Sequence, residues 1–190
     1  MPNRNLDFGR FGAQGIKGYQ AVARQLDALA GFIATPVSQR RGLLARLRYL
    51  TRSDRARAAA RAAGLTATER TIQAWLDGRR SPSKANLARI DDAYRQVRRQ
   101  NVARHLAARL NRSGRGTRVE IHPLNQAQVP RPQQRVIEHR TLNVRHWDGL
   151  VQAWADGDDQ ALDAAWVDHV VDLGSQWGQY EHVTNIGFAA

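Results

Sequence analysis

The stretch over residues 53–94 constrains the fold more than any other part of the chain, because strong helix signals follow one another there. Ser53 is a suitable N-cap residue, and Gly64 is well suited to end the helix that follows it. Between them, small residues recur at the spacing of one helical face: Ala56, Ala59, Ala60 and Ala63. These signals predict a first helix that another helix can approach closely.

A second helix is predicted directly after the first. Residues 66–69, Thr-Ala-Thr-Glu, have the pattern of a capping box, in which the threonine and glutamate side chains each satisfy a backbone N–H at the helix start. Ile72, Trp75 and Leu76 fall at i, i+3 and i+4, so we expect them to share the buried face. A short helix held out from a small-residue helix is typical of a helix-turn-helix, which we place at residues 53–78.

Any alanine-rich helical hairpin gives a similar pattern, and charge is what favours the helix-turn-helix. After Gly78, Ser81-Pro82-Ser83 restarts the chain as a third helix. A hairpin without an anionic partner has no need of the basic residues that surround this unit, which are Arg55, Arg57, Arg61, Arg70, Arg79, Arg80, Lys84 and Arg89.

The charge of the whole chain also indicates an anionic partner. Its 29 Lys and Arg against 17 Asp and Glu give a net charge of +12. Residues 1–145 hold all 29 basic residues and nine acidic ones, a net charge of +20, whereas residues 146–190 carry −8. A membrane surface also attracts positive charge, but dispersed arginines with no large aromatic face opposite them favour nucleic acid.

A helix-turn-helix on such a surface predicts contacts with double-stranded DNA. The residues expected to face base edges are Thr68, Arg70, Thr71 and Gln73. The residues expected to hold phosphates are Arg55, Arg57, Arg61, Arg79, Arg80 and Lys84.

The first half of the chain is predicted to be helical throughout. Residues 1–19 contain spaced glycines and basic residues, which indicates a flexible basic arm. Helices predicted over residues 19–34 and 38–50 are expected to pack beneath the helix-turn-helix. The third helix continues to Leu110 with a basic polar face, typical of a rod along phosphates, a dimer seam or a solvated face. Residues 20–112 are therefore predicted to form a helical DNA-binding domain.

The periodicity changes after the Gly-rich loop at residues 111–116. Strands are predicted near residues 118–122, 135–145 and 180–190, and helices at 147–156 and 158–173. Residues 113–190 thus form a predicted acidic, Trp-rich α+β domain, expected to mediate homodimerisation or to bind a protein partner. The predicted fold class is mainly α, with an N-terminal helix-turn-helix domain and long basic helix before a small α+β domain.

Several kinds of site are not expected. There is no cysteine, no phosphate-binding Gly-Lys-Ser/Thr loop, no dinucleotide fingerprint and no His-Glu-x-x-His pair, so we expect no enzyme, cofactor or small-molecule ligand. The six histidines show no metal-ligand spacing, and the acidic run at residues 156–159 fits helix capping, so no metal is expected. No apolar run suits a bilayer span or a signal peptide, which predicts a cytoplasmic, nucleoid-associated protein.

Three stretches, residues 64–76, 82–99 and 135–173, carry a resemblance to a known family, with the runs HRTLNV and AWADGDDQALDAAW looking most alike. The order of parts resembles the telomere-protecting terminal proteins of actinomycete linear chromosomes and plasmids. This resemblance implies covalent attachment to a DNA 5′ end through a threonine hydroxyl, with a telomere-recruiting partner. The corresponding stretch, residues 126–134, holds no Ser, Thr or Tyr; the nearest hydroxyl residues are Thr117 and Thr141.

Three functions remain open from the sequence. The first is a helix-turn-helix protein of an actinomycete genome or mobile element that binds double-stranded DNA at telomeric or regulatory sites. The second is a covalently attached terminal protein that primes DNA-end replication through a Thr or Ser hydroxyl. The third is an architectural or segregation protein that coats DNA.

Overall fold

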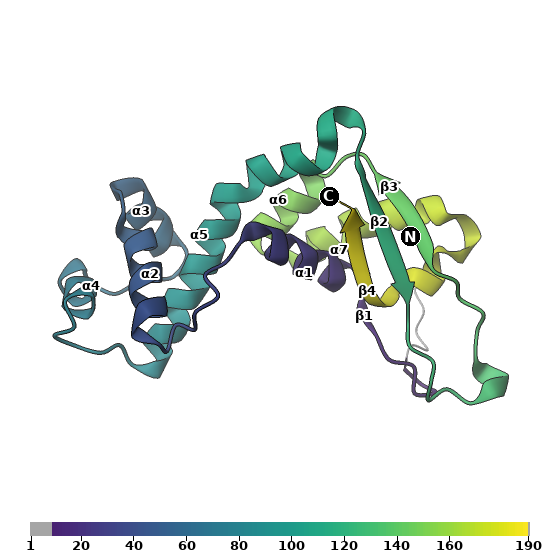
Figure 1. Ribbon diagram of the computed structural model, residues 1–190, viewed down its shortest axis with the longest axis horizontal. Coiled ribbons are helices and arrows are strands. Elements are labelled where there is room, and N and C mark those ends of the chain that lie inside the picture. Colours follow the sequence, from purple (N-terminus) through teal and green to yellow (C-terminus); the bar gives the residue numbers. More distant parts are fainter. Residues whose placement is uncertain (1–8, 190) are drawn as a thin grey trace. The chain divides into compact units, whose positions relative to one another are not determined.

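The structure, a computed structural model, describes residues 9–189, and for residues 175–177 only the backbone. Its described part is mainly helical, with seven α-helices and a small four-stranded antiparallel sheet (Figure 1). The prediction of a mainly α chain with a small sheet is therefore confirmed. The chain divides into two compact units. We call Ala30–Val102 the helical unit, and the described residues before and after it the sheet unit.

The helical unit is built from three short helices and the first part of a long one. These are α2 (Arg40–Thr51), α3 (Asp54–Ala62), α4 (Glu69–Leu76) and α5 (Lys84–Asn111). One hydrophobic core joins all four helices. It comprises Leu43, Leu47, Leu50, Ala60, Leu65, Trp75, Ile90, Ala93, Tyr94 and Val97. Trp75 is only 2% exposed, so the predicted inner face of α4 is confirmed at its largest residue.

The ends of these helices follow local rules, with two differences from the prediction. The Ser53 hydroxyl accepts a hydrogen bond from the Ala56 N–H, and Gly64 has a φ of 91°, both as expected. However, Thr68, not the first threonine of the predicted capping box, caps α4 by accepting from the Thr71 N–H. The chain is extended at Thr68, and Leu65 before it is buried in the core, so α4 begins later than predicted. Similarly, the helix predicted to begin at residue 38 begins at Arg40, after Gln39, whose side chain makes no cap hydrogen bond.

A buried arginine fixes α2 within the helical unit. Arg46 is 4% exposed, and its Nε donates to Oδ1 of Asp91 on α5 at 2.6 Å. Its two Nη atoms donate to the carbonyl oxygens of Ile33, Thr35 and Gly42 at 2.7–3.1 Å. One side chain thus connects α2, α5 and the segment before α2.

The sheet unit contains four strands in the order β1-β4-β2-β3, all paired antiparallel. The strands are β1 (Ile16–Lys17), β2 (Thr117–Pro123), β3 (Arg140–Val144) and β4 (His182–Ala189). The helices of this unit are α1 (Gly18–Ala30), α6 (Asp148–Asp156), α7 (Asp159–Val170) and the 3₁₀ segments Arg112–Gly114, Arg131–Gln133 and Val171–Tyr180.

One face of this sheet is buried and the other is polar. Along β2, Val119 and Ile121 are fully buried, while Arg118 is exposed and Glu120 is half-buried. Tryptophans supply much of the core: the Trp147 ring lies 4.8 Å from that of Phe188 on β4, and Trp154 Nε1 donates to Asp27 on α1 at 2.8 Å. The alternation leaves one side of β2 open to solvent.

The units do not follow the predicted boundaries. Helix α1, predicted to pack beneath the helix-turn-helix, lies instead in the sheet unit, where Asp27 accepts a hydrogen bond from Trp154 of α6. Within the predicted flexible arm, Gln14 forms a β-bridge with Asn125 and Ile16–Lys17 pair with β4; residues 1–8 lie outside the described residues. The strand predicted at residues 135–145 begins only at Arg140.

No helix among the described residues combines the length and the apolar character that crossing a bilayer requires.

Replacing Arg46 with methionine is expected to destabilise the helical unit by about 3 kcal/mol, because Asp91 and three carbonyl oxygens lose a buried donor. The matched control is Arg48→Met, an exposed arginine on the same helix. Urea unfolding followed by circular dichroism measures both. Equal unfolding free energies for the two variants would contradict this role of Arg46.

Candidate functional site

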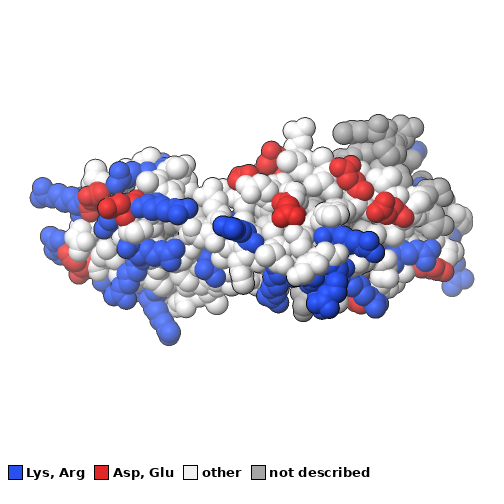
Figure 2. Space-filling model, turned by 90° about the horizontal axis from the view of Figure 1, so that it is seen from above, with Lys and Arg blue, Asp and Glu red and all other residues white. Residues whose placement is uncertain are grey.

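Nearly all of the net charge lies in the helical unit. Residues 30–102 hold 16 Lys and Arg against five Asp and Glu, a net charge of +11, and the remaining residues hold 13 against 12. On the face shown in Figure 2, basic side chains outnumber acidic ones over α2 to α4, at the left of the view. The acidic residues after position 146 share a compact unit with basic residues, so the sheet unit is almost neutral.

A groove of about 680 Å³ runs along α4 on the helical unit. We call it the α4 groove; its lining comes from the end of α2, from α3, from the turn at residues 65–68 and from α4. Half-buried Ile72 and Leu76 give it an apolar part, and Arg57, Arg61 and Arg70 add positive charge. The groove is therefore both apolar and basic.

The four predicted base-contact residues are close together, but some of their side chains already make hydrogen bonds within the protein. Arg70 and Gln73 are exposed, and both line the α4 groove. Thr68 and Thr71 instead have their hydroxyl oxygens 2.9 Å apart, and Thr68 also caps the helix. The Gln73 side chain donates to Asp77 Oδ1 at 2.7 Å. Arg70 is thus the member of this set without a hydrogen bond or ion pair among the described residues.

The residues predicted to contact phosphates lie around α3 and α4, and three of these arginines form ion pairs with acidic residues. Arg57 pairs with Asp54 at 2.7 Å and Arg61 with Glu69 at 2.9 Å. Arg79 pairs with Asp77.

The ion pair of Arg79 has an electrostatic consequence for its partner. Hydrogen bonds from Arg79, and then from Gln73, hold the pKa of Asp77 below its ordinary value. Asp77 therefore stays ionised next to two predicted DNA-contacting side chains. The other three predicted phosphate contacts, Arg55, Arg80 and Lys84, are exposed.

The basic stripe of α5 is partly used within the helical unit. Arg95 pairs with Asp91 at 3.1 Å, and the Arg98 Nε donates to the carbonyl of Ala30 at 2.9 Å. The roles considered for this helix, a rod along phosphates or a dimer seam, stay predictions.

The two candidate nucleotide acceptors differ sharply in exposure. Thr117 is 0% exposed, and its hydroxyl donates to the Leu110 carbonyl at 2.6 Å. Thr141 is exposed on β3, directly across from Glu120 of β2. Of the two hydroxyls, that of Thr141 is the one accessible to a nucleotide.

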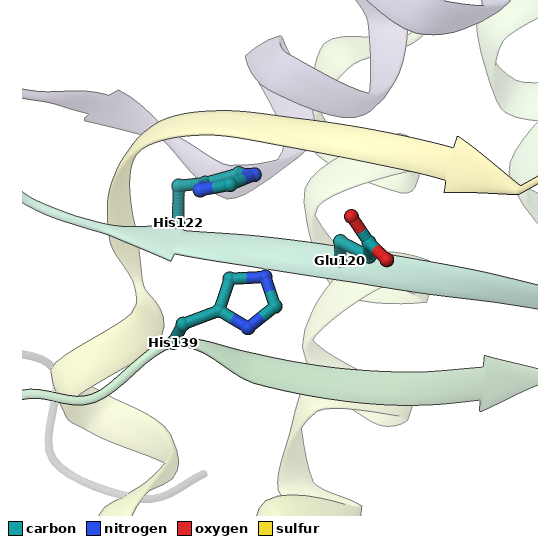
Figure 3. Close-up of side chains that lie close together, drawn as sticks. All are labelled: Glu120, His122 and His139. Atoms are coloured by element: carbon teal, nitrogen blue, oxygen red, sulfur yellow. The ribbon is translucent and has the colours of Figure 1, made fainter.

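The structure also brings together three side chains that the sequence did not single out, Glu120, His122 and His139 (Figure 3). A signal was present: residues at i and i+2 on a strand point to the same face, so Glu-Ile-His on β2 places two ligand types together. The third depends on the pairing of β2 with β3, which spacing along the chain does not reveal.

No protein-family model matches this chain, and the searches found no match among curated proteins or solved structures. The resemblance to terminal proteins and the homodimer or protein partner expected at residues 113–190 therefore stay predictions.

Proposed function

We propose that the protein binds double-stranded DNA through the helical unit, with α4 entering the major groove. The observation that carries this proposal is the net charge of +11 on a 73-residue unit in which the short helix α4 buries Trp75 and exposes Arg70 and Gln73. A polyanion is the partner that such a surface attracts over distance. Side chains of α4 that face the DNA major groove then contact base edges and recognise the DNA sequence.

Packing supports α4 as the recognition helix. Trp75 is buried in the core of the helical unit, and the Arg40 Nη2 donates to the Leu76 carbonyl at the end of α4 at 3.2 Å. The small residues Ala56 and Ala60 on α3 are buried, which allows close helix contacts. Because α4 has only eight residues, this anchoring supplies the rigidity that a free peptide of that length lacks.

The contacts divide between sequence reading and positioning. Arg70 and Gln73 carry the donors suited to guanine and adenine edges, and Thr68 and Thr71 flank them at the start of α4. Arg55, Arg80 and Lys84 are exposed for phosphates. Arg57, Arg61 and Arg79 reach phosphates by exchanging a carboxylate partner for a phosphate, so their net contribution is smaller.

The kind of DNA site is proposed from the resemblance stated above, which favours telomeric or regulatory DNA of an actinomycete linear replicon. A footprint on DNA fragments with internal and terminal sites distinguishes the functions. A bounded footprint supports a site-specific protein, and protection without a defined boundary supports the architectural alternative.

Binding to duplex DNA is expected to weaken steeply as salt rises, and two substitutions separate its parts. Arg70→Ala should lower affinity for the footprinted site by about tenfold while leaving random DNA almost unaffected. Arg80→Ala should weaken both and reduce the log–log salt slope by about 0.9. Fluorescence anisotropy measures these values. Arg24→Ala, an exposed arginine of the sheet unit, is the control, and a flat salt response of the wild type would refute the proposal.

Removing an acidic competitor is expected to strengthen binding. Asp77→Ala frees Arg79 and Gln73 and removes a negative charge beside the DNA, so affinity should rise about fivefold at low salt. Asp92→Ala removes the same charge from an exposed position on α5. An equal gain from both substitutions would mean that net charge alone, and not the release of these side chains, sets the affinity.

A second candidate function, covalent priming at a DNA end, is favoured by the exposure of Thr141. The resemblance to terminal proteins implies a threonine acceptor, and Thr141 is the exposed one of the two nearest hydroxyl residues. Its hydroxyl oxygen would attack the α-phosphate of the first nucleoside triphosphate and release pyrophosphate. With labelled nucleotide and a cognate polymerase, the wild type should retain label after denaturation, and Thr141→Val should not. Thr184→Val, which removes an exposed hydroxyl on β4, should retain it. If the wild type retains no label, priming is excluded and the regulatory function is favoured.

A further inference from the structure

The open face of the sheet carries one compact group of metal-ligand types. Glu120 and His122 project from β2, and His139 lies just before β3 (Figure 3). One oxygen of Glu120 and one nitrogen from each imidazole lie within 4.8 Å of one another. The two imidazole rings have centroids 4.8 Å apart and planes inclined at 58°. This arrangement is distinct from the surface proposed to bind DNA.

We propose that Glu120, His122 and His139 bind one divalent transition-metal ion, with Zn²⁺ the best fit. Two imidazole nitrogens and one carboxylate oxygen form the donor set of zinc sites that keep a coordination position open. Imidazole ligands favour zinc and its transition-metal neighbours over Mg²⁺ and Ca²⁺, which prefer oxygen. The metal would lie at the surface, with its free position available to water or to an anionic oxygen.

The backbone places these ligands without strain. Ile121 between the two β2 ligands is fully buried, so the strand cannot rotate and both neighbours stay on the outer face. Across from Glu120 on β4 lies Gly187, where an added Cβ would come within 3.8 Å of the Glu120 Cβ. Gly187 therefore puts no side chain against the Glu120 carboxylate.

A modest closing movement completes the site. Zinc–ligand bonds of about 2.0–2.1 Å in tetrahedral geometry bring ligand atoms to about 3.4 Å from one another. Glu120 and His122 are half-buried and His139 is exposed, so side-chain rotations can supply this approach. Among the described residues, neither imidazole has a hydrogen bond that must first break, which lowers the cost of ligation.

One interaction competes with the metal. Arg118 Nη2 lies 3.4 Å from Glu120 Oε1, and the arginine side chain is 61% exposed. An exposed ion pair of this kind contributes at most about 1 kcal/mol, so it competes only weakly for the Glu120 carboxylate. The same contact gives the proposal a test with the opposite sign, because removing Arg118 should free Glu120 for the metal.

The test uses the full chain without a histidine tag, titrated with Zn²⁺ by isothermal calorimetry and with Co²⁺ by visible absorption. One Zn²⁺ per chain is expected, together with Co²⁺ d–d bands. His122→Ala, His139→Ala and Glu120→Gln should each weaken binding at least about tenfold. Arg118→Gln should preserve or tighten it. His105→Ala, an exposed histidine on α5, is the matched control and should change nothing.

Two results would overturn the proposal. One is the absence of stoichiometric Zn²⁺ binding at micromolar concentrations by a chain that circular dichroism shows to be folded. The other is uptake that the three ligand substitutions leave unchanged, or that His105→Ala reduces equally. Neither result bears on DNA binding, because the proposed DNA contacts lie in the helical unit and can be measured in the presence of a chelator.

Discussion

The helical unit depends on a guanidinium held away from water. A buried arginine is tolerated only when its charge and its donors are satisfied, and Arg46 achieves this with one carboxylate and three carbonyl oxygens. Its ring neighbour Tyr94 lies 5.3 Å from the guanidinium carbon, and the Tyr94 hydroxyl accepts from the Ile33 N–H. These contacts orient α2 on α5. The position of α4 follows, because Trp75 packs into the core that these two helices form.

The acidic residues of the chain have two different physical roles. In the helical unit, Asp54, Glu69 and Asp77 each hold an arginine at the surface, which orders the basic side chains and reduces their local field. The eight acidic residues after position 146 instead share a unit with arginines from positions 104–145 and neutralise it. The proposed DNA-binding surface is therefore confined to one unit. Long-range attraction would act there and orient the approach of a duplex.

Local rules predicted the helices well, and tertiary pairing limited the rest. Ser53 and Asp158 cap α3 and α7 as expected, and the long third helix ends one residue after the predicted Leu110. The capping-box prediction failed because two threonines, two residues apart, both precede α4, and the second of them caps the helix.

Contacts between residues distant in sequence could not be predicted as well. The apolar stripe of α1 indicates burial but not against what; its contact with Trp154 joins residues 127 positions apart. The metal-ligand group needs the antiparallel register of β2 and β3, which pairs Glu120 with Thr141 and brings His139 beside His122. The two candidate hydroxyls differ for a more local reason: strand alternation places Thr117 on the buried face with Val119 and Ile121, and Thr141 on the exposed face, opposite to that of Val144.

The hydroxyl of Thr117 has a consequence for the whole sheet. It satisfies a carbonyl in the last turn of α5, so the first residue of β2 is clamped to a helix whose own position is set by packing. This hydrogen bond helps to fix the register of β2. A slip of β2 by one position would break it and turn the outward side chains of the strand into the core. The geometry of the outer face therefore depends on the end of a helix as well as on the pairing of the strands.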